Sequence, residues 1–182
     1  LSQGSSEGLD ANAKRAQILA SGVAVPWAYE AQELLKRDFG VVADIWSVTS
    51  WGELRRDGLA HDQAKFDNPA EEHAPTWVEA KLRDTQGPIV AVSDYMKAVP
   101  DQIRPWVPRQ YAVLGADGFG FSDTRAASRR FYKIDGPSIA VGVLQQLAAQ
   151  GEAPLQWALD AAEKYQLWDV NAGTSGAVGG DA

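Results

Sequence analysis

The glycine-rich segment Gly-Ala-Asp-Gly-Phe-Gly, at residues 115–120, has the composition that comes nearest to a ligand-binding motif. It follows an apolar run and precedes a predicted helix, where main-chain amides and a helix N-terminus can hold an anion. Its glycines are spaced G-x-x-G-x-G, which is not the dinucleotide pattern, and the segment has no P-loop lysine. We therefore interpret it as a tight turn, with a phosphate site as the alternative.

The two histidines, His61 and His73, occur in a polar segment that also carries Asp62, Asp67, Glu71 and Glu72. Such side chains could hold a metal ion. The chain has no cysteine, and its histidines are not four residues apart as on one helix face. The pattern therefore favours solvated loop residues over a metal site.

Three further features allow functional and structural interpretations. The pair Ser93-Asp94 follows an apolar run, but there is no G-x-S-x-G motif and no evident histidine partner, so a serine hydrolase is disfavoured. A basic cluster could face an acidic partner or a neighbouring domain, although a solvated helix face is the commoner case. The seven tryptophans fit either a domain interface or a core. The basic cluster consists of Arg125, Arg129, Arg130 and Lys133.

The composition is that of a globular protein. Hydrophobic residues make up 45% and charged residues 23% of the 182 residues, and the formal net charge of -7 disfavours nucleic acid as a partner. The apolar runs at 89–92 and 139–144 are too short to cross a bilayer. The chain has no signal-peptide pattern and does not begin with Met, so we expect a piece of a longer protein.

Apolar strands and amphipathic helices alternate along the chain, which predicts an α/β fold with a mostly parallel sheet covered on both faces. Ser50 and Glu53 form a predicted capping box, and Gly40 a predicted C-cap. We expect an N-terminal arm at 1–13, one domain at 14–170 and a flexible tail at 171–182. The predicted strands are 15–21, 41–48, 88–93 and 111–114. The predicted helices are 28–40, a segment from 51 onward, 77–83, 100–106, a segment from 122 or 123, 138–150 and 155–167, with a surface loop at 60–75.

Four segments together resemble one enzyme family. They are Arg-Ala-Gln-Ile-Leu-Ala-Ser-Gly at 15–22, Ala-Asp-Ile-Trp-Ser-Val-Thr-Ser-Trp-Gly-Glu-Leu-Arg-Arg-Asp-Gly at 43–58, Val-Ser-Asp-Tyr-Met-Lys at 92–97, and Leu-Gly-Ala-Asp-Gly-Phe-Gly-Phe-Ser-Asp-Thr-Arg at 114–125. In order and spacing they are similar to the last domain of homodimeric, acetyl-transferring pyruvate dehydrogenases, especially the actinobacterial type. Residues 61–76 depart from the family pattern.

The resemblance implies a transketolase C-terminal-like, three-layer α/β/α sandwich whose parallel strands are ordered 2-1-3-4. It implies a homodimeric, cytoplasmic enzyme that uses thiamine diphosphate and Mg to decarboxylate pyruvate and transfers the acetyl unit to a lipoyl group of its acyltransferase partner. The edge beside residues 42–48 would then lack a strand. We expect a second molecule or the N-terminal arm to cover this edge, because an unpaired strand edge invites pairing.

No catalytic, cofactor-binding or metal-binding residue is transferred from the family. Asp117-Gly118 is preceded by Ala116 instead of the glycine of the family's diphosphate motif, and the required adjacent asparagines are absent. We predict only a domain interface, formed with the cofactor-binding domains by Asp117, Gly118, Phe119, Gly120 and Ser122. The alternatives are a domain of transketolase or another 2-oxoacid dehydrogenase, and a non-enzymatic flavodoxin-like binding module.

Overall fold

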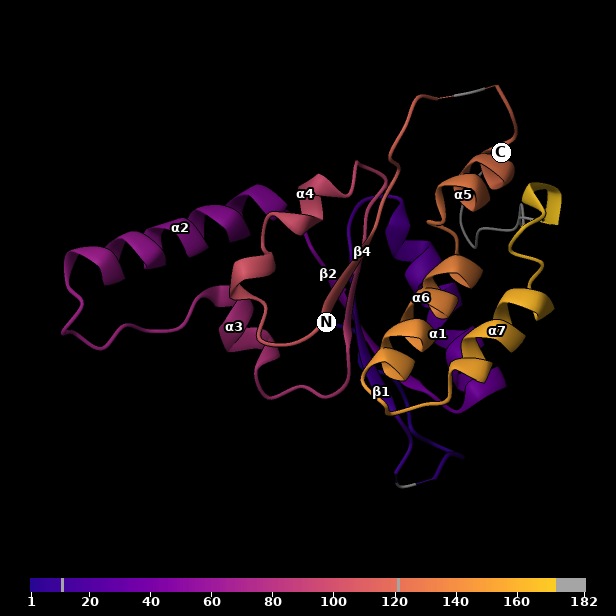
Figure 1. The fold of residues 1–182 in the computed structure, drawn as a ribbon, viewed down its shortest axis with the longest axis horizontal. Coiled ribbons are helices and arrows are strands. Elements are labelled where there is room, and N and C mark those ends of the chain that lie inside the picture. Colours follow the sequence, from indigo (N-terminus) through magenta and orange to yellow (C-terminus); the bar gives the residue numbers. More distant parts are fainter. Residues whose placement is uncertain (11, 121, 173–182) are drawn as a thin grey trace.

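Four parallel strands form the centre of the chain, in the order β2-β1-β3-β4 (Figure 1). The computed structural model describes residues 1–10, 12–120 and 122–172. The strands are β1 (Arg15–Ala20), β2 (Val42–Ser47), β3 (Ile89–Val92) and β4 (Tyr111–Leu114). The predicted fold class and strand order are therefore confirmed.

The apolar runs of the two central strands, β1 and β3, are buried on both faces of the sheet, whereas β4 is only partly buried after Tyr111. Ile18 of β1 is aligned with Ile45 of β2 on one side and Val90 of β3 on the other, and all three are almost completely buried. Residues of this kind suit a sheet that helices cover on both faces.

One face of the sheet carries the larger core. Helices α1 (Ala24–Phe39) and α6 (Gly136–Ala149) pack against it and against each other, and α7 (Leu155–Lys164) packs on α6. Helix α5 (Arg125–Tyr132) lies on the same side (Figure 1). The predicted C-cap is confirmed, because Gly40 ends α1 with a φ of 63° in the left-handed region.

The opposite face carries a smaller core. It is covered by α2 (Trp51–Asp67), α3 (Trp77–Leu82), α4 (Ala98–Asp101) and the 3₁₀ turn η1 (Arg104–Trp106). The predicted capping box also forms its N-cap bond, since the Ser50 hydroxyl accepts the Glu53 amide at 3.1 Å. Helices on both faces give the three layers that the resemblance implies.

The predicted surface loop at 60–75 is wrong over its first half, because α2 continues to Asp67. The sequence between Leu59 and Asn68 is polar, but it contains no glycine or proline that would end a helix. Polarity there indicates exposure to solvent, not an irregular backbone. Only residues 68–76 form the connection to α3.

Among the residues that the structure describes, no helix has both the length and the apolar run that a membrane span requires.

Other boundaries shift by less. Helix α5 begins at Arg125, after the N-cap Thr124, instead of at Ser122 or Asp123. The predicted helix 100–106 is divided into α4 and η1. At the end of the described chain lies a second 3₁₀ turn, η2 (Val170–Ala172), and the rest of the predicted tail lies outside the described residues.

The N-terminal arm lies along the free edge of β2. Ser2 and Ile45 exchange two antiparallel main-chain hydrogen bonds of 2.7 and 2.8 Å, and the Gly4 amide donates to Asp44 at 2.9 Å. A Cβ atom at Gly4 would collide with the Ala43 carbonyl oxygen, so only glycine allows this approach. The structure thus shows one of the two expected ways to cover the edge. The division into arm, domain and tail remains a prediction.

Candidate functional site

The carboxyl ends of the four strands meet at one edge of the sheet, and the loops that follow them form the candidate site. Open α/β sheets bind ligands and partners outside this edge. The predicted interface residues lie here, in the loop that joins β4 to α5 and extends beyond the sheet (Figure 1). These residues are Asp117, Gly118, Phe119, Gly120 and Ser122, all of them exposed.

The loop after β4 is tied to the loop after β3. The Lys97 amide donates to Asp117 Oδ1 at 2.8 Å, and Lys97 Nζ lies 3.6 Å from Asp117 Oδ2. The Ala116 amide donates to the Tyr95 carbonyl oxygen at 2.9 Å. A Cβ atom at Gly115 would lie 2.7 Å from that same oxygen, so the close approach requires glycine. The two loops therefore present one connected surface.

The tied loops expose large apolar side chains, which we call the carboxyl-edge patch: Tyr95, Met96 and Phe119. Their exposed fractions are 62%, 58% and 97%. The Tyr132 hydroxyl donates to the Phe119 carbonyl oxygen and so fixes the backbone beneath the most exposed ring. Exposed aromatic residues and methionine are typical of surfaces that contact protein.

The geometry of the glycine turn does not favour an anion site. The first turn of α5 is capped by Thr124, whose Oγ1 accepts the Ala127 amide at 3.1 Å. The turn also carries the Asp117 carboxylate, which would repel an anion. A tight turn that supports the carboxyl-edge patch is the better interpretation.

Two buried hydroxyl groups lie where β1 and β3 end. Ser21 Oγ and Ser93 Oγ are 3.1 Å apart; Trp51 Nε1 donates to Ser21 Oγ at 2.9 Å, and the Tyr95 amide donates to Ser93 Oγ at 3.1 Å. Ser93 is completely buried, so it holds the loops together and is not placed as a nucleophile. Ser21 also lines a cleft of about 550 Å³ at this edge. The contact between Ser21 and Trp51 could not be predicted from their spacing in the sequence, because strand pairing brings the two residues together.

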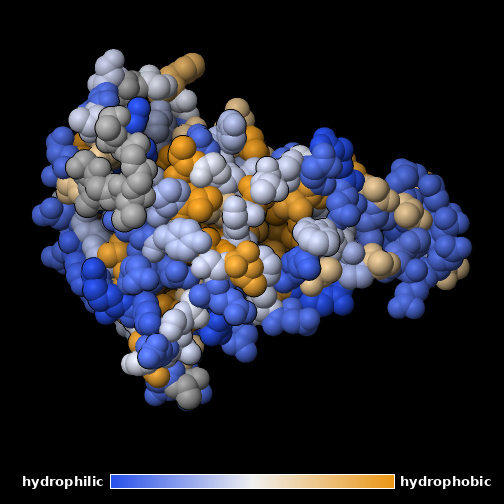
Figure 2. Space-filling model, turned by 180° about the vertical axis from the view of Figure 1, so that it is seen from behind, coloured by the Kyte–Doolittle hydropathy of each residue, from blue (hydrophilic) through white to orange (hydrophobic). Residues whose placement is uncertain are grey.

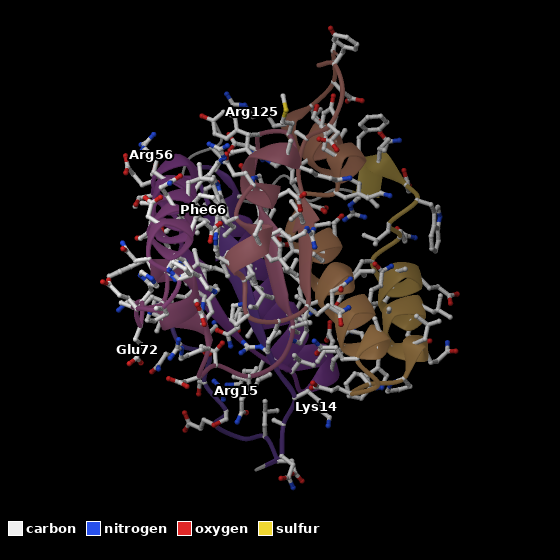
Figure 3. The ribbon with its side chains drawn as sticks, turned by 60° about the vertical axis from the view of Figure 1, so that its left-hand side comes forward. Lys14, Arg15, Arg56, Phe66, Glu72 and Arg125 are labelled. Carbon is white, nitrogen blue, oxygen red and sulfur yellow. The ribbon has the colours of Figure 1, made fainter. Side chains whose placement is uncertain are left out.

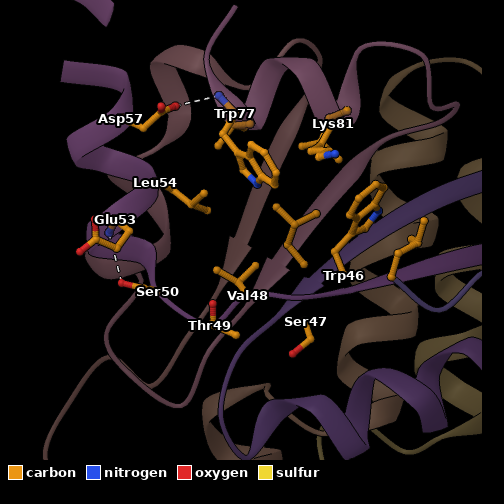
Figure 4. Close-up of a pocket in the computed structure, with 14 residues that line it drawn as sticks. Trp46, Ser47, Val48, Thr49, Ser50, Glu53, Leu54, Asp57, Trp77 and Lys81 are labelled. Carbon is orange, nitrogen blue, oxygen red and sulfur yellow. Dashed lines mark hydrogen bonds between the residues drawn. The ribbon is translucent and has the colours of Figure 1, made fainter. Parts of the chain in front are cut away.

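A second hollow, of about 780 Å³, lies beside β2 and between α2 and α3 (Figure 4). Trp46, Val48 and Leu54 line it, and Trp77 forms part of its rim. The Trp77 amide donates to Asp57 at 2.7 Å, and the Lys81 ammonium group lies 4.4 Å from the centre of the Trp77 ring. The sequence could not predict this hollow, because its walls come from separate elements and from Leu1.

The structure brings the two histidines together. His61 lies on α2 and not in a loop, and its ring centre is 6.3 Å from that of His73 in an edge-to-face arrangement. His73 Nε2 is 2.9 Å from the Asn68 carbonyl oxygen, which requires a proton on that nitrogen. Within residues 1–10, 12–120 and 122–172, no group of three or more potential ligands could hold a metal ion. The histidine pair therefore connects the 68–76 segment to α2.

The basic cluster is not simply a solvated face. Arg130 is only 2% exposed; its Nε donates to Asp135 at 2.6 Å and its Nη1 to the Tyr165 carbonyl oxygen at 2.7 Å. Arg129 lies 4.6 Å from the centre of the Trp27 ring. At least these two arginines hold helices together within the domain.

The tryptophans divide between the two interpretations. Trp27 and Trp51 are buried in the two cores, whereas Trp77 and Trp168 are 58% and 69% exposed. The exposed pair are available to a partner surface.

Three side chains with shifted pKa values contribute to the fold away from the carboxyl-edge patch. Burial raises the pKa of Tyr111, whose hydroxyl donates to the Pro100 carbonyl oxygen, and also that of Tyr165. The hydrogen bond from Arg37 lowers the pKa of Asp38 well below its usual range. Tyr165 and Asp38 are themselves hydrogen-bonded and join the ends of α7 and α1. These groups stabilise contacts between elements.

Known proteins match most of the chain. Over 160 residues it is 54% identical to the pyruvate dehydrogenase E1 component of Mycolicibacterium smegmatis, and over 158 residues it is 51% identical to that of Mycobacterium tuberculosis. These matches cover 88% and 87% of the chain but 17% of each relative. The E1 component of Corynebacterium glutamicum is 50% identical over 168 residues, which are 92% of the chain and 18% of that relative. The chain thus spans less than a fifth of the relatives that it matches.

The chain also matches a known domain family, in agreement with the fold. Residues 5–135 match the transketolase-like TK C-terminal domain. This stretch covers most of the chain and includes all four strands and the carboxyl-edge patch. The chain therefore belongs to the family of transketolase-like C-terminal domains.

Proposed function

We propose that this chain is the C-terminal domain of a pyruvate dehydrogenase E1 component and serves as an interface domain, not as the catalytic centre. The observation that carries the proposal is the identity of 50 to 54% over 87 to 92% of the chain to proteins of that name. The common name of these relatives favours pyruvate dehydrogenase over transketolase, and it favours an enzyme domain over a free-standing binding module.

The proposed parent enzyme is a homodimeric oxidoreductase in the cytoplasm that decarboxylates pyruvate and reductively acetylates the lipoyl group of its acyltransferase partner. Thiamine diphosphate would stabilise the carbanion in that reaction, with Mg holding the diphosphate. The partners of this chain would be the cofactor-binding domains, the second subunit and the acyltransferase.

The residues of this chain do not fit the cofactor. A diphosphate bound through Mg needs oxygen ligands for the ion and donors for the phosphates. The asparagines that could supply ligands are dispersed: Asn12 lies in the N-terminal arm, Asn68 ends α2 and Asn171 lies in η2. Asp117 is already bound to Lys97. We therefore derive no catalytic step within this chain and assign the cofactor to other domains of the parent.

The carboxyl-edge patch supports the interface role. Phe119 is almost fully exposed on a loop that several contacts hold in place, so little ordering entropy would be lost when another domain covers it. The patch would position the cofactor-binding domains by contact and would exclude water from their boundary.

Titration calorimetry with thiamine diphosphate and Mg tests the cofactor part of the proposal. We expect no heat of binding from this chain, because no set of ligands and donors is assembled among the residues that the structure describes. Saturable binding with micromolar affinity would contradict the proposal and would restore the glycine turn as a diphosphate site.

The interface part is tested in the parent enzyme with Phe119→Ser, compared with Leu155→Ser on the exposed side of α7. Both side chains are more than half exposed, so neither change should unfold this domain. We expect Phe119→Ser to lower the thermal stability of the assembled enzyme and its activity, and Leu155→Ser to leave both near the unsubstituted values. Equal behaviour of the two variants would show that the patch does not bind another domain.

A further inference from the structure

Helix α2 is an arm that projects from the body, and the chain turns back at its far end. Residues 68–76 return from there to α3 (Figure 1). From behind, this projection is mainly hydrophilic (Figure 2). Figure 3 shows Phe66 and Glu72 on this side of the molecule, away from α6 and α7. Side chains of α2 and of the returning segment can therefore meet at a surface that is open to solvent.

The two histidines of the chain meet at this surface. His61 lies on α2 and His73 on the returning segment, and the sequence contains no other histidine. Their ring centres are 6.3 Å apart, and both residues are half-buried. The turn of the chain after α2 brings the rings together, which is why their spacing in the sequence does not resemble a metal-binding motif.

Each imidazole has one nitrogen engaged with an acceptor. His73 Nε2 lies 2.9 Å from the Asn68 carbonyl oxygen, and His61 Nδ1 lies 3.4 Å from Asp62 Oδ1. Both arrangements favour a proton on the engaged nitrogen, so the lone pairs lie on His61 Nε2 and His73 Nδ1. For these two nitrogens, no hydrogen bond occurs with any residue that the structure describes.

The engaged nitrogens match the surroundings of metal-binding histidines. A ligating imidazole almost always donates its other N–H group to a carboxylate, a main-chain carbonyl or water, and this contact selects the nitrogen that faces the ion. His61 has the carboxylate, and His73 has the main-chain carbonyl. The outer contacts of a two-histidine site are thus already in place.

We propose that His61 Nε2 and His73 Nδ1 together bind one zinc ion, with water completing its coordination. Imidazole nitrogen suits zinc and its neighbours copper and nickel, whereas Mg²⁺ and Ca²⁺ prefer oxygen ligands. Among the described residues no group of three or more potential ligands occurs, so the site is open and exchanges its ion.

The distance between the rings allows such a site after a small movement. Two imidazoles on one tetrahedral zinc ion have ring centres about 5 Å apart, because each Zn–N bond is about 2.1 Å long. The rings must therefore approach each other by about 1 Å. The returning segment is mostly exposed and has no regular secondary structure, so it can move by this amount. Bound zinc then joins this segment to the outer half of α2.

Titration calorimetry of the chain, prepared without a histidine tag, measures the binding of zinc. We expect saturable binding of one ion per chain. Mg²⁺ at the same concentrations should give no heat, which separates imidazole ligation from attraction to a chain of net charge -7. In NMR spectra, zinc should shift the ring signals of both histidines together.

His61→Ala and His73→Ala should each raise the dissociation constant for zinc by about tenfold or more, because even the loss of a ligand's outer hydrogen-bond partner typically costs that much. Gln63→Ala is the matched control. Gln63 lies on the same helix, and its amide binds Asp67, so its removal should leave zinc binding unchanged. Circular dichroism of each variant verifies that α2 remains helical.

Hydrogen exchange provides a second readout. Zinc should slow the exchange of amides in the outer half of α2 and leave α6 unchanged, since only the arm is joined to the returning segment. The proposal is overturned if zinc does not bind saturably, if Mg²⁺ binds equally well, or if either histidine variant binds zinc as tightly as the unsubstituted chain. It does not depend on the enzyme proposed above, so either proposal can fail without the other.

Discussion

Helices α6 and α2 are of similar length and differ in what holds them in place. Helix α6 buries nine of its 14 residues between the sheet and its neighbouring helices, whereas α2 buries two of 17. Residues that are apolar on nearly all sides form α6, so tertiary burial provides most of its stability. Helix α2 depends on its N-cap, on local ion pairs and on a few contacts at its inner half.

The comparison shows that a helix can be specified by local chemistry and yet remain largely unburied by its own domain. Trp106 contacts the middle of α2: its ring lies on Gly58 and its Nε1 donates to both oxygens of Asp62 at 3.1 Å. Beyond this point the arm extends into solvent. Such regions of low contact density are expected to open locally before the rest of the fold.

The largest expected effect is the difference between two leucine truncations. Leu144→Ala in α6 removes a completely buried side chain and should lower the free energy of unfolding by about 3 kcal/mol. Leu59→Ala in α2 should lower it by less than about 1 kcal/mol in the monomer, because Leu59 is 44% exposed. Urea denaturation at low protein concentration measures both. Equal losses would mean that α2 is packed as tightly as α6.

Gly58→Ala tests the inner contact of the arm. Helix propensity alone predicts that alanine stabilises α2 by about 1 kcal/mol. The added Cβ would collide with the Trp106 ring, however, and overpacking costs about 1 to 3 kcal/mol. We expect a net loss and faster hydrogen exchange of α2 amides. Slower exchange would show that the ring can move aside freely.

Removing the N-cap should affect α2 more than the body. Ser50→Ala leaves the Glu53 amide without its acceptor and should cost about 1 kcal/mol. The loss should appear as faster hydrogen exchange or proteolysis in α2, with α6 unchanged. Ser50→Thr retains the oxygen and should behave like the unsubstituted chain; if both variants open equally, the hydroxyl does not hold the helix.

The smallest effect concerns pH and belongs to the body. Arg37, Lys164 and Tyr165 contact Asp38, and the Arg37 hydrogen bond contributes most to lowering the Asp38 pKa. A lowered pKa stabilises the fold above the ordinary aspartate value of 3.8, and this contribution is lost as pH falls below it. Asp38→Asn should therefore make the midpoint temperature of unfolding less dependent on pH during acidification. An unchanged pH dependence of the midpoint temperature would mean that other carboxylates, and not Asp38, cause it.

The sequence determined the order of the elements and most of their ends. The short apolar runs at β1 to β4 favour strands between helices, and Ser50 and Gly40 mark helix ends by their own chemistry. The sequence could not distinguish an exposed helix from a polar loop after Leu59. Both are hydrophilic, and the hydrophobic periodicity of an unburied helix is weak. That ambiguity produced the error at residues 60–67.

What only the tertiary structure decided is which distant groups meet. The proposed interface residues 117–120 could be named from the sequence, but the bonds of Ala116 to Tyr95 and of Asp117 to Lys97 that hold their loop arise from the pairing of β3 with β4. The inward position of Arg130 likewise depends on where α6 and the end of α7 lie. Local propensity acts over a few residues, whereas these contacts join positions up to 35 residues apart and exist only after the sheet and helices have packed.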